Sequence, residues 1–98
     1  MGYKHGVDFD VWLGPYRIRV RFVDNIVADG EKCDGLFKAA EKEILIDSGL
    51  GPTEAYETFL HECVEAIDTL HDMGLSHQTI TTLGIGLAQL LPRAEVLD

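Results

Sequence analysis

Residues 52–73 carry the clearest structural signal in the chain, and they restrict what the remaining residues can build. At about 100° per residue, the apolar side chains of this stretch fall on one broad arc of a helix. Pro52 suits the first turn of a helix, where its missing N–H is not needed, and Gly74 suits the position just past the end. We therefore predict a long amphipathic helix over about 52–73, with an apolar arc of Tyr56, Phe59, Leu60, Cys63, Val64, Ile67 and Leu70.

A different periodicity covers Tyr16–Val23, where apolar and charged side chains alternate. Alternation with β-branched and aromatic residues predicts a half-buried strand. The apolar run 7–13 precedes it, and Gly14-Pro15 between the two runs indicates the turn of a hairpin. One face of the second strand carries Arg17, Arg19 and Arg21. The simpler interpretation of this row is a solvated face; the alternative is a surface that faces an anion or a substrate.

The remaining segments complete an α+β pattern. Residues 24–34 contain Asp29-Gly30 and Asp34-Gly35 and are expected to form a loop, whereas 35–39 and 43–47 are expected to be short strands. Ser76 can cap a second helix over about 76–91, in which the small residues Gly84 and Gly86 allow close packing on the first helix. We predict one domain over 1–98: an antiparallel-rich sheet of three to four strands (about 7–47) followed by two helices, with 1–6 disordered and 93–98 as a tail.

Composition restricts the classes of function. The 98 residues carry a net charge of −9, which argues against a general nucleic-acid binder and favours a protein or peptide partner. No apolar run is long enough to cross a membrane. Cys33 and Cys63 are too few for a disulfide framework, so we expect a reducing, cytoplasmic setting. The apolar residues 87–91 are interpreted as core, and a contact between subunits of a homo-oligomer is the alternative.

The long helix contains His61-Glu62-x-x-Glu65. His61 and Glu65 are four residues apart, so they share one helix face and can converge on one ion, and both are acceptable ligands for zinc or another divalent metal. Glu62 stands where a metallopeptidase carries its general base. His77 and Asp68 are the candidates for a third ligand. The alternative is an ordinary polar helix face, because the same stripe contains Glu54, Thr58, His61, Glu65, Asp68 and Asp72.

The order of several short pieces around this motif resembles the minimal zincin or gluzincin-like metallopeptidases common in phages and mobile elements. The pieces are Gly35-Leu36-Phe37, Ile44-Leu45-Ile46-Asp47, Thr58-Phe59-Leu60-His61-Glu62, Ala66-Ile67-Asp68 and Leu75-Ser76. The resemblance spans about 16–91. It implies a zincin-like core in which the motif helix packs under a small sheet, whose edge strand Glu43–Asp47 binds extended peptide by strand addition. It also implies that His61 is a zinc ligand and Glu62 the general base.

This chain departs from the family at Glu65, which replaces the second histidine of His-Glu-x-x-His. A carboxylate there favours a harder divalent metal than imidazole does. The sequence therefore supports a degenerate metallopeptidase-like protein with weak or absent hydrolytic activity. The alternative is a non-enzymatic protein whose acidic helix face docks on a basic partner or inhibits it, through Glu54, Glu57, Glu65, Asp68 and Asp72. A third hypothesis is a structural component of a phage or mobile element.

Overall fold

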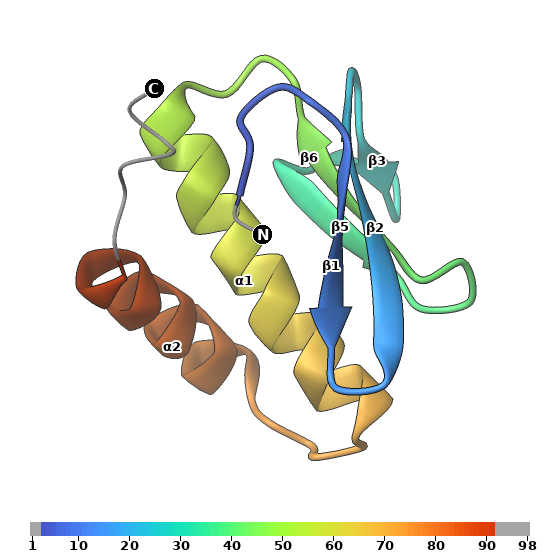
Figure 1. Cartoon of the computed structure of the whole chain (residues 1–98), viewed down its shortest axis with the longest axis vertical. Helices are drawn as coiled ribbons and strands as arrows, with labels where there is room; N and C mark the ends of the chain where they lie inside the picture. Colours follow the sequence, from blue (N-terminus) through green and yellow to red (C-terminus); the bar gives the residue numbers. More distant parts are fainter. Residues whose placement is uncertain (1–2, 92–98) are drawn as a thin grey trace.

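The computed structural model describes residues 3–91 and has the expected α+β architecture. A four-stranded sheet forms one layer, α1 (Pro52–Leu70) packs on one face of it, and α2 (His77–Leu90) packs on α1 (Figure 1). The order of strands across the sheet is β1-β2-β6-β5. Their bounds are β1 Phe9–Leu13, β2 Tyr16–Val23, β5 Gly35–Lys38 and β6 Glu43–Asp47. Within the described part of the chain, no helix is long and apolar enough to cross a membrane.

The hairpin of β1 and β2 forms as its alternation predicts. The two strands pair antiparallel around Gly14-Pro15, with Val11 opposite Ile18. Ile18 and Val20 are completely buried against the helices, while the arginines of β2 lie on the open face. Arg17 and Arg19 form ion pairs with Asp10, and Arg21 pairs with Glu43 at 3.7 Å. The row of arginines is therefore a solvated, ion-paired face, as the simpler interpretation held.

The position of β6 corrects the prediction that Glu43–Asp47 is an edge strand. This strand lies inside the sheet, parallel to β2 on one side and antiparallel to β5 on the other. Its central place fits its composition, because Ile44 and Ile46 are completely buried. The chain reaches β6 only after passing along β5, which leaves β5 at the edge. The periodicity that identified both strands carries no information about which strand pairs on each side.

Residues 24–34 were expected to be a loop, and they contain a small hairpin instead. β3 (Val27–Ala28) pairs antiparallel with β4 (Glu31–Lys32). Asp29 and Gly30 join the strands with φ values of 53° and 79°. Positive φ at both central residues is the requirement of the commonest two-residue hairpin turn, and Asp-Gly is one of the pairs that satisfy it. The Asp-Gly pair was thus a hairpin signal rather than only a loop signal.

Both helices are present, with ends slightly inside the predicted limits. α1 stops at Leu70, and Asp72 and Gly74 then take positive φ values of 50° and 71° as the chain turns. The Ser76 side chain accepts a hydrogen bond from the Thr79 N–H at 3.1 Å and caps α2, as predicted. Ile67 departs from the predicted arc because it is 38% exposed. At the end of α2, Ala88 is buried but Leu90 is exposed, so the 87–91 segment is core only in part.

Aromatic rings close the core between the sheet and α1. Tyr3 is buried, with its ring centroid 5.1 Å from those of Tyr56 and Phe59, and Phe9 packs on the same cluster. We expected residues 1–6 to be disordered, and Tyr3 instead belongs to the core. Residues 1–2 and the predicted tail 93–98 lie outside the described residues. This packing fixes α1 against the sheet and so sets the position of the motif it carries.

Candidate functional site

The three motif residues of α1 converge in space. A ring nitrogen of His61, a carboxylate oxygen of Glu62 and a carboxylate oxygen of Glu65 lie within 4.8 Å of one another. His61 Nε2 lies 3.7 Å from Glu65 Oε2, the contact that the spacing of four residues predicts. An imidazole and two carboxylates at this separation form a set of donors for a divalent metal ion.

Glu62 differs from the other acidic residues of α1 because its side chain is buried. It is 5% exposed, and its Oε1 atom is a buried polar atom that has no hydrogen-bond partner among the described residues. Burial, followed by the nearby negative charge of Glu65, raises the pKa of Glu62 to about 8, and a backbone hydrogen bond with Phe37 opposes the shift. A buried polar group normally has a partner, so the free oxygen requires an explanation.

Two glycines allow other elements to approach the motif closely. A Cβ atom on Gly35 of β5 would lie 2.5 Å from Thr58 Cγ2 and 3.2 Å from Glu62 Oε2. A Cβ atom on Gly84 of α2 would lie 3.1 Å from His61 Cα. Close packing is therefore confirmed at Gly84, whereas a Cβ atom on Gly86 would meet nothing of the first helix within 4 Å, so the expectation was wrong for Gly86. Together the two glycines place β5 and α2 on either side of the motif.

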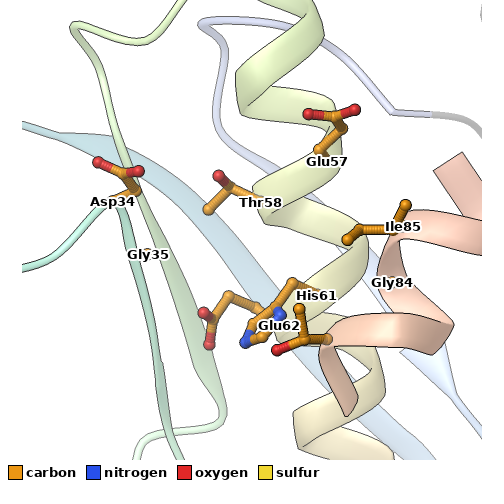
Figure 2. A pocket seen from close by; sticks show the side chains of 9 residues that line it. Asp34, Gly35, Glu57, Thr58, His61, Glu62, Gly84 and Ile85 are labelled. Carbon is orange, nitrogen blue, oxygen red and sulfur yellow. The ribbon is translucent and has the colours of Figure 1, made fainter. Parts of the chain in front are cut away.

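A cavity of about 320 Å³ lies between β5, α1 and α2. Figure 2 shows its walls, with His61 and Glu62 at one end and Glu57 on α1 toward the other. The lining residues are Asp34, Gly35, Glu57, Thr58, His61, Glu62, Thr81, Gly84 and Ile85. Apart from His61, Glu62 and Glu57, the sequence did not mark these residues as functional. Only Gly35 and Gly84, glycines inside a strand and a helix, carried a signal of close approach.

Of the two candidates for a third ligand, His77 lies near the motif and Asp68 does not. The ring centroid of His77, at the start of α2, is 5.8 Å from that of His61. Asp68 instead holds the turn after α1, where its carboxylate accepts a hydrogen bond from the Leu75 N–H at 2.8 Å. Of the remaining predicted residues, Glu54 is exposed in the first turn of α1 and Asp72 is exposed beyond its end. Neither joins the group of three, and His77 is the histidine that the fold brings toward it.

Cys63 lies between the motif residues in sequence but takes no part in the group. Its side chain packs against the core, and burial, together with the charge of Glu62, raises the pKa of its thiol to about 12. The thiol therefore stays protonated at neutral pH, which makes Cys63 a poor nucleophile.

The surroundings of the group carry an excess of negative charge. No lysine or arginine occurs from residue 43 to residue 92, although α1 and the turn after it contain six carboxylates: Glu54, Glu57, Glu62, Glu65, Asp68 and Asp72. A cation is thus the complementary ligand on electrostatic grounds.

Comparison of the chain with known protein families, with curated proteins and with solved structures gave no match. The arrangement of His61, Glu62 and Glu65 is accordingly what connects the structure to the zincin resemblance.

Proposed function

We propose that the protein binds a divalent metal ion through His61 and Glu65, with His77 as the third ligand, and that it is a degenerate zincin-like protein. The observation that carries the proposal is the unpartnered, buried carboxylate oxygen of Glu62 beside an imidazole and a second carboxylate. Burying a carboxylate without a partner is costly, and a bound cation at this place would offset that cost. The donors suit zinc, and the carboxylate of Glu65 also suits a harder ion such as manganese.

The proposed chemistry is slow hydrolysis of a peptide bond. The metal would act as a Lewis acid that polarises the scissile carbonyl. Glu62 lines the cavity, where its carboxylate can take a proton from a water molecule and return it to the leaving nitrogen. Glu65 brings an anionic ligand where the family has a neutral one, which reduces the effective charge of the ion. We therefore expect hydrolysis to be weak compared with that of His-Glu-x-x-His enzymes.

The order of strands in the sheet indicates where a peptide substrate would bind. β5 rather than β6 is the edge strand next to the cavity, so an extended peptide would add to β5.

Calorimetric titration of zinc or manganese into metal-free protein tests the metal site. We expect His77→Ala to weaken metal binding by about tenfold or more, which is the loss of affinity typical when a residue that supports a metal site is removed. His71→Ala is the matched control, because His71 is exposed and its ring lies beside Tyr16 instead of in the cavity. Equal affinities of the two variants would remove His77 from the ligand set.

Hydrolysis of labelled casein tests the chemistry separately. We expect Glu62→Gln, assayed at a metal concentration that loads both proteins, to lose the slow release of label, and we expect a chelator to abolish release by the wild type. Release that persists in Glu62→Gln or in the presence of the chelator would rule out the proposed hydrolysis.

A further inference from the structure

The edge of β5 that borders the cavity has backbone groups without a neighbouring strand. The Asp47 N–H donates to the Asp34 C=O at 2.8 Å, and along an antiparallel ladder every second residue faces its partner strand. Leu36 and Lys38 therefore direct their backbone groups to β6. Gly35 and Phe37 direct theirs to the opposite edge, which agrees with the hydrogen bond between Phe37 and Glu62. An extended peptide could pair with this edge.

Two carboxylates lie beside the same edge. Asp34 immediately precedes β5, and Glu57 lies one helical turn before His61 on α1 (Figure 2). Both side chains line the cavity, both residues are exposed, and neither forms an ion pair within residues 3–91. Other acidic groups nearby already have partners: Asp47 pairs with Lys32 at 3.8 Å, and Glu65 contacts His61. The cavity thus has two unpaired carboxylates away from the metal-binding group.

Within residues 3–91, the distribution of lysines and arginines leaves these two carboxylates without an ion-pair partner. Seven of the eight lysines and arginines precede residue 43, and neither α1 nor α2 contains one. The arginines of β2 lie on the opposite face of the sheet, paired with Asp10 and Glu43. In the described part of the chain, no lysine or arginine pairs with Asp34 or Glu57, so a cationic ligand would complement them.

We propose that the cavity selects extended peptides with a lysine or arginine side chain, which binds between Asp34 and Glu57 while the peptide backbone pairs with the outer edge of β5 beside Gly35. A second observation points to a ligand in the same cavity, namely the buried and unpartnered Glu62 Oε1 atom in its wall. The proposal rests on the proposed function for the place where the peptide lies. The preference for a cationic side chain needs only the two carboxylates, and so it applies to the metal-free protein as well.

Titration of isotope-labelled, metal-free protein with short peptides tests this preference by NMR. The probes are three acetylated and amidated pentapeptides, alanine throughout except for a central lysine, norleucine or glutamate. A pentapeptide can shift its register along the strand edge to bring the central residue to the carboxylates. We expect the amide signals of Gly35, Thr58 and Gly84 to move, and the lysine peptide to bind about fivefold more tightly than the norleucine peptide, the combined effect of two surface ion pairs.

Matched variants assign the preference to the two residues. Asp34→Asn combined with Glu57→Gln should bind the lysine and norleucine peptides equally. Glu41→Gln, which removes a charge in the turn between β5 and β6, should leave the preference unchanged. Equal binding of the three peptides by the wild type, or no shift of the cavity signals at millimolar peptide, would overturn the proposal.

The outcome is separable from that of the proposed function. A lysine preference in a protein that binds no metal would leave this inference standing and remove the metal site. Metal binding without a preference for the lysine peptide would support the metal site and overturn this inference.

Discussion

Glu62 is the residue on which the site depends, because its carboxylate is buried beside a second carboxylate and lacks a partner for one oxygen. Its neutral form is favoured in the absence of a cation, which is why its pKa rises to about 8. The same environment would favour the charged form once a divalent ion is bound. Burying a carboxylate beside a second carboxylate costs stability, and carboxylates with such shifted pKa values are typical of functional sites.

The raised pKa of Glu62 predicts how the stability of the metal-free protein changes with pH. The pKa of Glu62 is higher in the folded state, about 8, than the ordinary value of 4.5 expected in the unfolded chain. Between these values the folded state binds more protons, so the free energy of unfolding falls as pH rises, by up to a few kcal/mol in all. Glu62→Gln should remove this contribution, and denaturant unfolding between pH 5 and 9, about the range of the two pKa values, measures it.

Glu57→Gln is the control for that measurement, because Glu57 lies on the same helix and is exposed. Its free energy of unfolding should follow that of the wild type at every pH. If the difference between Glu62→Gln and the wild type did not grow with pH, Glu62 would not be ionising in a buried environment.

At the scale of elements, the site exists because β5 and α2 both approach α1 at a glycine. Gly35 meets Thr58 and Glu62, and Gly84 meets the backbone of His61. A side chain at Gly35 would push β5 away from α1, and a side chain at Gly84 would push α2 away and separate His77 from His61. The functional group is thus positioned by packing as well as by the motif itself.

Gly35→Ala tests this packing. Its Cβ atom would overlap Thr58 Cγ2, so we expect a loss of about 1–3 kcal/mol in the free energy of unfolding, as for other overpacked positions. Gly86→Ala is the contrasting variant: apart from the backbone of α2 itself, no atom lies within 4 Å of its added Cβ, and alanine favours a helix by up to about 1 kcal/mol over glycine. Thr58→Ser, which removes Cγ2, should restore part of the loss in Gly35→Ala. Gly35→Ala as stable as the wild type would show that the close approach does not matter.

At the scale of the whole molecule, the charge is divided between two sides. The open face of the sheet carries arginines that are paired with acids, whereas the helices carry carboxylates and no lysine or arginine. The net charge of −9 is therefore concentrated on the side that contains the cavity. A cationic ligand, whether a metal ion or a basic side chain, would be drawn to this side.

The sequence was sufficient for those features that depend on local periodicity. Alternation located β2 and its buried face, and helical spacing located α1 and the pair of His61 and Glu65. It was not sufficient for long-range pairing, so β6 was placed at the edge although it is central. Nor could it show that Glu62 is buried, because that depends on how closely β5 approaches α1.

The central claim is that His61 and Glu65 hold a divalent metal ion, and the metal content of the purified protein tests it most directly. The wild type, His61→Ala and His71→Ala would be grown with zinc, manganese and nickel, purified without a chelator and analysed for each element. We predict a near-stoichiometric amount of one metal in the wild type and in His71→Ala, and only background in His61→Ala. Background metal in the wild type, or equal metal in the wild type and His61→Ala, would contradict the claim.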